Sequence, residues 1–144
     1  MQHICSDECQ AYHVGIIGSS SLTPDQRDVA WELVWMIVFY YRTLQDQGLN
    51  PRPGGISIVS GRSPKGGVDI MAANAANGLG LELLEFPPKH NRWRPEGFEE
   101  RNLLIARRCD RLYRIATRDS KTYGSGWTAD RAEEMGKLVR RLYI

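Results

Sequence analysis

The sequence predicts a single α/β domain in which a mostly parallel sheet is covered by helices on both faces. Short, nearly continuous apolar runs alternate along the chain with longer segments of helical periodicity, and loops of small residues follow the first two runs. With 144 residues, 42% of them hydrophobic and 25% charged, the chain is large enough to bury a core of its own.

The first strand and the first helix follow a polar tail of residues 1–12. Residues 13–18 are nearly all apolar and end at a glycine, which is typical of a short buried strand. Thr23 as N-cap and Pro24 at the first helical position predict a helix that extends to about Asp46. A glycine and a Pro/Gly cluster then end this helix and form a turn.

The middle of the chain repeats this alternation. Residues 56–59 are β-branched apart from one serine and predict the second strand. The Ala-rich and Met-containing segment 68–77 predicts a helix packed closely on the sheet, ended by Gly78 and Gly80. Residues 81–86 predict the third strand.

The last part of the chain contains a loop, two helices and two strands. Residues 87–97 are polar, aromatic and bounded by proline, which predicts a loop over one end of the sheet. The elements that follow are a helix at 98–109, a strand at 111–117, a helix at 128–136 and a strand at 138–144. Together these elements predict a single Rossmann-like, three-layer α/β/α domain over residues 13–144, in which ligands bind beyond the carboxyl ends of the strands.

Composition excludes several classes of protein. The net charge of +2 is too small to indicate a nucleic-acid binder, although residues 89–118 hold nine Lys or Arg against four acids. Cys5, Cys9 and Cys109 do not form a disulfide framework, so we expect a reducing, cytoplasmic location. The apolar segment 29–41 is too short and too polar to span a membrane, and no secretory signal is visible.

Three loops rich in small residues are the main functional signal, because they present backbone N–H groups and hydroxyls to an anion. The candidate ligand-binding residues in them are Gly18, Ser19 and Ser20, then Ser60, Gly61, Arg62, Lys65, Gly66 and Gly67, and finally Gly124, Ser125, Gly126 and Thr128. The loops lack a full dinucleotide fingerprint and a Walker A lysine, and a tight turn is the alternative interpretation of the first two. Together they imply one phosphate-rich ligand and no cofactor.

Two further residues have side chains that suit a nucleotide. Asp69 lies in the first turn of the helix after the second loop, where it either caps the helix or accepts a hydrogen bond from a ribose hydroxyl. Trp93 lies among cations in segment 88–94, where it either stacks on a base or packs in a subunit contact.

Two other patterns have mainly structural explanations. One is a wide apolar stripe on the first helix, made of Trp31, Val34, Trp35, Ile37, Val38 and Tyr41. We expect this stripe to be core, although its breadth leaves part of it for a second subunit. The other is the set His3, Cys5, Cys9 and His13. Its spacing matches no common zinc signature, so we expect no metal site.

Several of these motifs resemble the SLOG superfamily of Rossmann-like nucleotide-ligand proteins, and most closely the prophage YspA-like proteins of unknown function. The motifs are Ser60-Gly61 with Gly66-Gly67-Val68-Asp69-Ile70-Met71-Ala72, Glu100-Arg101-Asn102 with Asp110, and Gly124-Ser125-Gly126 with Thr128 and Asp130. The resemblance covers nearly the whole chain. It implies a nucleotide-type ligand and a homo-oligomer, with Arg101 and Asn102 among the ligand-binding residues.

The same segments are more distantly similar to the Lonely Guy phosphoribohydrolases, which cleave the base from nucleoside 5′-monophosphates. Arg101 matches an arginine of that family, Asn102 replaces a lysine, and Asp130 stands where its first acid would be. The Pro-Gly-Gly loop of the family is missing, and Trp127 is inserted. If this chain is such an enzyme, Arg101 and Asp130 are catalytic; otherwise they are a surface arginine and a first-turn helix acid.

The sequence therefore supports three functions in order of preference. The first is the binding of a nucleotide or nucleotide-derived small molecule by a sensor or sequestering protein. The second is N-glycosidic hydrolysis of nucleoside monophosphates. The third is single-stranded DNA binding, because the DNA-processing protein DprA resembles the same superfamily and residues 89–118 are basic.

Overall fold

A computed structural model describes residues 11–120 and 123–144 of the chain. Strands and helices alternate in the order β1 (Tyr12–Gly18), α2 (Pro24–Asp46), β2 (Ile56–Ser60), α3 (Val68–Leu79), β3 (Glu82–Glu85), α4 (Phe98–Arg108), β4 (Arg111–Ala116), α5 (Tyr123–Glu134) and β5 (Leu138–Tyr143). The predicted tail, with His3, Cys5 and Cys9, lies almost entirely outside the described residues.

The described strands form one five-stranded sheet in the order β3-β2-β1-β4-β5, and every neighbouring pair is parallel. The predicted α/β class is confirmed, and the sheet is fully parallel. The chain moves from β1 outward to β3 and then returns to place β4 on the other side of β1. This reversal beside β1 is a topological switch point, where open α/β sheets commonly bind ligands.

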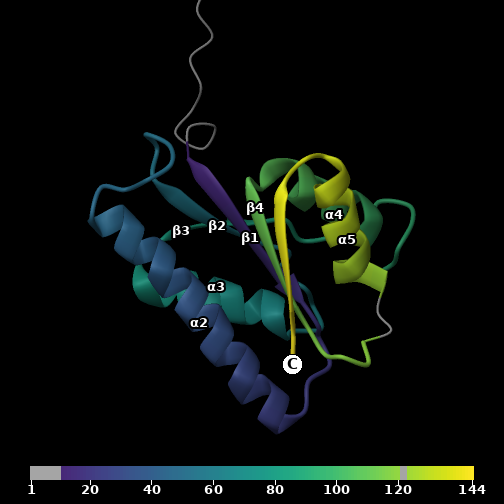
Figure 1. The fold of residues 1–144 in the computed structure, drawn as a ribbon. Helices are drawn as coiled ribbons and strands as arrows, with labels where there is room; N and C mark the ends of the chain where they lie inside the picture. The colour runs from purple at the N-terminus through teal and green to yellow at the C-terminus, as the bar shows by residue number, and fades with distance from the viewer. Residues whose placement is uncertain (1–10, 121–122) are drawn as a thin grey trace, which may run out of the picture.

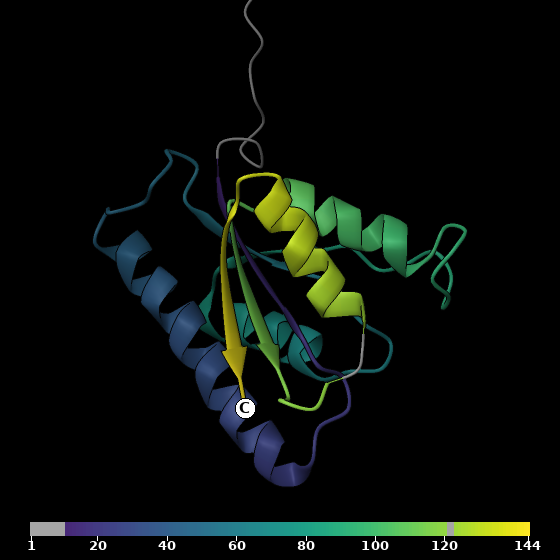
Figure 2. The same cartoon turned by 45° about the vertical axis from the view of Figure 1, so that its right-hand side comes forward.

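Helices cover both faces of the sheet, so the molecule has the three predicted layers. Figures 1 and 2 show α2 and α3 on one face and α4 and α5 on the other. Two apolar clusters fill the spaces between the layers. Val14 and Ile16 face the first helix pair, whereas Ile17 faces the second. The alternation along β1 follows from the period of two in a strand that is buried on both faces.

The first helix begins as the sequence predicts. The side chains of Thr23 and Gln26 each accept a hydrogen bond from the other residue's backbone N–H, which forms a capping box, and Pro24 follows the cap. The expected apolar stripe is only partly core. Val34, Val38 and Tyr41 are buried, whereas the side of the helix that carries Trp31 and Trp35 is exposed to solvent.

The last helix differs from the prediction. It begins at Tyr123 rather than at Thr128, so the predicted Gly-Ser-Gly loop is the first turn of α5. Two glycines disfavour a helix by about 1 kcal/mol each, but contacts with β4 offset this cost. Arg114 donates a hydrogen bond from Nε to Ser125 Oγ (2.9 Å), and a Cβ at Gly126 would lie only 3.4 Å from its guanidinium.

The remaining boundaries agree closely with the sequence. Helix α3 continues through Gly78 and ends at Gly80, which adopts a left-handed conformation and donates its N–H to carbonyls of the last turn. No helix within residues 11–120 and 123–144 is long and apolar enough to cross a membrane.

Because the backbone is closely packed at Gly18, a single methyl group added at this residue should strongly lower the stability of the protein. A Cβ at Gly18 would lie 1.9 Å from the carbonyl oxygen of Ile115 and 2.9 Å from Val68 Cγ2. We expect Gly18→Ala to lower the free energy of unfolding by about 3 kcal/mol or more, measured by urea denaturation.

Gly78→Ala is the matched control. Gly78 lies inside α3, and a Cβ there would meet only the Trp35 ring, at 3.6 Å. This substitution should leave stability unchanged or raise it by about 0.5–1 kcal/mol, because alanine is the better helix former. Equal effects of the two substitutions would contradict the contact at Gly18.

Candidate functional site

A cavity of about 620 Å³ opens at the carboxyl ends of the central strands, between α3 on one side and α4 and α5 on the other. Its size falls within the range of small-molecule sites, about 300–1,000 Å³. The structure brings together in its lining these residues proposed from sequence: Gly18, Ser20, Lys65, Asp69, Trp93, Arg101, Asn102, Gly124, Ser125 and Thr128.

The other candidate residues of the first two loops build the site without lining this cavity. Ser19 ties the loop after β1 to its neighbours: its Oγ accepts from the N–H of Thr117 (3.1 Å) and its carbonyl accepts from the N–H of Val68 (3.1 Å). Ser60 donates from Oγ to the main-chain carbonyl of Asp69 (2.8 Å). These hydroxyls are therefore occupied by the protein itself.

Glycines are required at several positions of the three loops, because other groups of the protein lie too close to leave room for a side chain. Gly67 has a positive φ of 78°, and a Cβ there would lie 2.3 Å from the carbonyl oxygen of Ser19. Gly61 lies directly under two charged side chains, because a Cβ there would be 2.5 Å from Arg101 Nη1 and 2.7 Å from Asp69 Oδ2. Gly126 provides the same kind of space for Arg114. Arg62 and Gly66 line a separate, neighbouring cavity.

Asp69 and Arg101 form the charged centre of the cavity. Both lie in its lining although their residues are only 6% and 7% exposed. The interpretation of Arg101 as a solvent-exposed helix arginine is therefore wrong. Burial raises the pKa of the Asp69 carboxyl to about 6, against the lowering effects of the Arg101 charge and of hydrogen bonds from the backbone N–H groups of Ser63 and Gly18. Burial also lowers the pKa of Arg101, while Asp69 raises it.

Arg101 is held in place by several acceptors. Its Nε donates to Asn102 Oδ1 (2.6 Å), and its Nη1 donates to the carbonyl oxygens of Gly61 and, at 3.3 Å, of Phe86. The guanidinium carbon lies 5.2 Å from the centroid of the Phe98 ring. These contacts fix the orientation of the positive charge before any ligand binds, which reduces the entropy lost on binding.

Asn102 connects α4 to α5. Its Nδ2 donates to the carbonyl of Gly124 (3.4 Å), which also accepts from the hydroxyl of Thr128 (2.7 Å). The two helices therefore meet at the cavity through polar groups. Because the hydroxyl of Thr128 already donates a hydrogen bond within its own helix, Thr128 mainly shapes the cavity wall.

Two tryptophans form an aromatic wall of the cavity. The ring centroids of Trp93 and Trp127 lie 5.1 Å apart at an angle of 84°, which is an edge-to-face pair, and the guanidinium carbon of Arg131 lies 5.4 Å from the Trp127 ring centroid. Both rings line the cavity. The sequence identifies Trp93 as a base-stacking candidate but treats Trp127 only as an insertion, because its partner lies 34 positions away in the chain.

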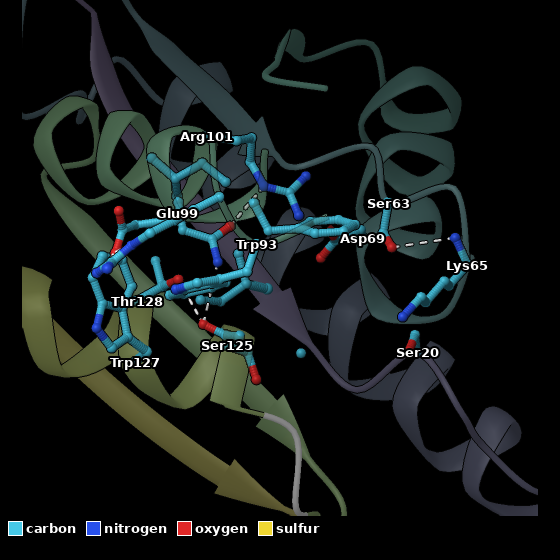
Figure 3. A pocket seen from close by; sticks show the side chains of 17 residues that line it. Ser20, Ser63, Lys65, Asp69, Trp93, Glu99, Arg101, Ser125, Trp127 and Thr128 are labelled. Atoms are coloured by element: carbon cyan, nitrogen blue, oxygen red, sulfur yellow. Dashed lines mark hydrogen bonds and ion pairs between the residues drawn. The ribbon is translucent and has the colours of Figure 1, made fainter. Parts of the chain in front are cut away.

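Three other lining residues are not among the candidates from sequence: Ser63, which lies within the second small-residue loop, and Phe98 and Glu99. Phe98 and Glu99 begin α4 directly after a polar loop, which is the signal that could have identified them. Glu99 accepts from Arg94 Nε at 2.7 Å. Figure 3 shows Lys65, Ser63 and Ser20 on one side of the cavity and Trp127 and Thr128 on the opposite side, with Arg101 and Asp69 between them.

Asp130 does not join this group. Its side chain is 61% exposed and forms an ion pair with Arg141 on β5, with 2.8 Å between Oδ1 and Nη2. Because α5 begins at Tyr123, Asp130 lies in a later turn than the sequence predicts, and its side chain pairs with the neighbouring strand. Within residues 11–120 and 123–144, no group of three or more His, Cys, Asp or Glu is arranged to hold a metal ion.

Comparison with known proteins identifies a fold neighbour. No family model and no curated protein matches the sequence. Among solved structures, the fold is similar to DNA processing protein A from Helicobacter pylori, a structure described in terms of its single-stranded DNA binding mode. The TM-score is 0.56 at 20% identity, over 94% of this chain and 66% of that one. The likeness shows the fold alone, and the chain spans just under two thirds of that neighbour's length.

The raised pKa of Asp69 predicts a pH dependence of stability. Because the pKa of about 6 lies above the ordinary value of 3.8, the folded protein binds more protons than the unfolded chain between these values. The contribution of Asp69 to stability is therefore fully present only below pH 3.8, falls as the pH rises above this value and is lost as the pH passes through 6. We expect this contribution to fall by about 1 kcal/mol between pH 5 and pH 7.5.

The measurement is urea denaturation of the wild type and of Asp69→Asn at both pH values. The variant should lose this part of the pH dependence, because asparagine does not titrate. A pH dependence that is the same in both proteins would show that Asp69 titrates at its ordinary value.

Proposed function

We propose that this protein binds a nucleotide or nucleotide-derived small molecule in the 620 Å³ cavity. The observation that carries the proposal is the arrangement of its lining: an aromatic wall on one side, Lys65 and two hydroxyls on the other, and the Arg101 and Asp69 pair between them. These groups match the parts of a nucleotide in order, namely an aromatic base, a sugar with hydroxyls and an anionic phosphate.

Each part of the ligand has a partner in this assignment. The base packs against Trp93 and Trp127. The carboxylate of Asp69, which is mostly ionised at neutral pH, accepts hydrogen bonds from sugar hydroxyls. Lys65 is exposed, and its Nζ lies 5.9 Å from the Phe98 ring centroid, so its charge is available to the phosphate at the cavity mouth.

We extend the proposal to the family and to the setting. The order of the motifs supports a protein of the SLOG type, of the YspA-like kind, that acts in the cytoplasm as a sensor or a sequestering protein. Cleavage of the ligand is not included, because the acid expected from the Lonely Guy pattern, Asp130, is directed away from the cavity.

Single-stranded DNA binding is the second candidate, and the fold neighbour favours it. The same aromatic wall could stack on the bases of a strand. The basic segment 89–118 offers fewer positive charges to a DNA strand than the sequence suggests. Arg101 and Arg114 are buried, and Arg94 is paired with Glu99. We therefore rank this function below the binding of a small nucleotide.

Calorimetric titration with AMP, ADP-ribose and a single strand of about 20 nucleotides tests the two functions. If a small nucleotide is the ligand, Trp127→Ala and Lys65→Ala should weaken its binding by about tenfold or more, because they remove a stacking face and a charged contact. Trp31→Ala, on the exposed face of α2, and Lys89→Ala, outside the cavity lining, are the matched controls and should have no effect.

The outcomes separate the candidates. Strand binding that weakens steeply with salt and responds to Lys89→Ala, without binding of AMP or ADP-ribose, would establish the second candidate and reject the first. Release of free base during the titration, followed by chromatography, would show that the site is an enzyme.

We also propose that the protein is a homodimer that pairs through α2. This helix exposes a set of large apolar side chains that are between 37% and 65% accessible: Val29, Trp31, Trp35, Met36, Phe39 and Tyr40. Together they expose roughly 500 Å² per chain, which is near the upper end of the roughly 300–600 Å² that the largest apolar patch of a monomer covers, and such patches are often functional. Two such faces packed against each other would bury about 1,000 Å², which is about the minimum area of a biological interface.

Light scattering coupled to size-exclusion chromatography tests this pairing. The wild type should elute as a dimer, and the double variant Met36→Glu with Tyr40→Glu should be monomeric, because it would bury charges at the interface. Leu49→Glu, at a residue that is 59% exposed but beyond the helix, is the control and should remain dimeric. A monomeric wild type at micromolar concentration would contradict the proposal.

A further inference from the structure

A second cavity of about 480 Å³ adjoins the first. Ser63 lines both cavities. Along the rest of the loop between β2 and α3 the residues alternate: Lys65 lines the first cavity, whereas Arg62, Pro64 and Gly66 line the second. This loop is therefore a partition with a cavity on each side and Ser63 at its edge.

The long loop before α4 also contributes to both cavities. Pro87, Pro88 and Asn91 line the second cavity, and Trp93 and Arg94, a few residues later, line the first. Two separate loops thus run past both cavities in turn. A ligand that lies along this pair of loops would enter the second cavity as soon as it extended beyond the first.

The lining of the second cavity suits a flat heterocycle. Three proline residues and Ile70 provide apolar surface, and the Asn91 side chain offers both a donor and an acceptor to the edge of a ring. Its volume also lies within the range for small-molecule sites, about 300–1,000 Å³. This combination of apolar walls with a single amide is the kind of lining that orients a base.

Cations lie on both sides of the partition. Lys65 belongs to the first cavity and Arg62 to the second. Arg62 has a φ of 46°, in the left-handed region that residues other than glycine rarely adopt. Its side chain is 64% exposed, and Nε lies 3.8 Å from Glu85 Oε2, so this weak surface pair leaves the guanidinium accessible to an anion.

We infer that the ligand is a dinucleotide, in which two nucleosides are joined by a diphosphate that crosses the partition at Ser63. One nucleoside occupies the first cavity, as proposed above for a nucleotide, and the second base occupies the second cavity beside Asn91. The diphosphate then lies between Lys65 and Arg62. This inference rests on the proposed function, because it extends the same site by a second compartment.

Calorimetric titration of the full chain with AMP and with diadenosine 5′,5′-diphosphate tests the inference. The dinucleotide should bind at least about tenfold more tightly than AMP, because its second half binds at a high effective concentration. Asn91→Ala should weaken binding of the dinucleotide by about fivefold, which corresponds to one lost hydrogen bond, and leave AMP unchanged. Asn74→Ala, at an exposed position on α3, is the matched control.

Ile70→Phe is an independent variant that fills the second cavity, and its fold can be checked by its melting temperature. It should reduce the affinity for the dinucleotide to that for AMP. Equal affinities of the wild type for AMP and the dinucleotide would overturn the inference while leaving the proposed function intact. Absence of binding to either compound would reject both.

A DNA dinucleotide, deoxyadenylyl-(3′→5′)-deoxyadenosine, is the third arm. It carries one phosphate in place of two and lacks the 2′-hydroxyls of ribose, so it should bind more weakly than the diphosphate. Tighter binding of the DNA dinucleotide would overturn the inference, because the two cavities would then hold consecutive nucleotides of a strand.

Discussion

The site depends on a close backbone contact at the carboxyl end of the sheet. The end of β1 meets β4 and the start of α3 with almost no side chain between them: a Cβ at Gly18 would overlap the carbonyl of Ile115, and one at Gly67 would overlap Ser19. The Val68 N–H then donates to the Ser19 carbonyl, which satisfies one of the free donors at the start of α3. Because three elements converge here at van der Waals distance, the loops around this point are held in fixed positions relative to one another.

That contact explains how a carboxylate can be buried at the floor of the cavity. Asp69 follows Val68 directly in α3, so the position of its side chain is set by the same junction. Backbone N–H groups of Ser63 and Gly18 stabilise its charge, while burial disfavours it. Arg101 extends from α4, on the other face of the sheet, and its guanidinium lies over Gly61. A larger residue at Gly61 would collide with the side chains of Arg101 and Asp69. The fold therefore orients the two charged side chains before a ligand binds. The hydrogen bonds around them offset the free-energy cost of burying their charges.

The fold itself does not decide the function. Rossmann-like sheets support many activities, and a neighbour at 20% identity shows the architecture without the chemistry. A nucleotide is favoured instead by the side chains that meet in one cavity: an aromatic pair, a buried acid and arginine, and an exposed lysine. The second cavity adds apolar walls and an arginine on the far side of one loop. A ligand with two bases and a central anion uses all of these groups, which is why the two cavities are best explained together.

The sequence by itself determined the alternation of strands and helices, the parallel sheet and the glycines at its carboxyl end. These features follow from local periodicity, turn chemistry and capping, as the capping box at Thr23 illustrates. Only the tertiary structure decided which candidates meet. Helix α5 begins five residues earlier than its propensity suggests, because Arg114 packs against Ser125 and Gly126. Asp130 pairs with Arg141 on β5 and does not line the cavity. The burial of Arg101 and the pairing of Trp93 with Trp127 depend on contacts between residues distant in the chain, which no local pattern records.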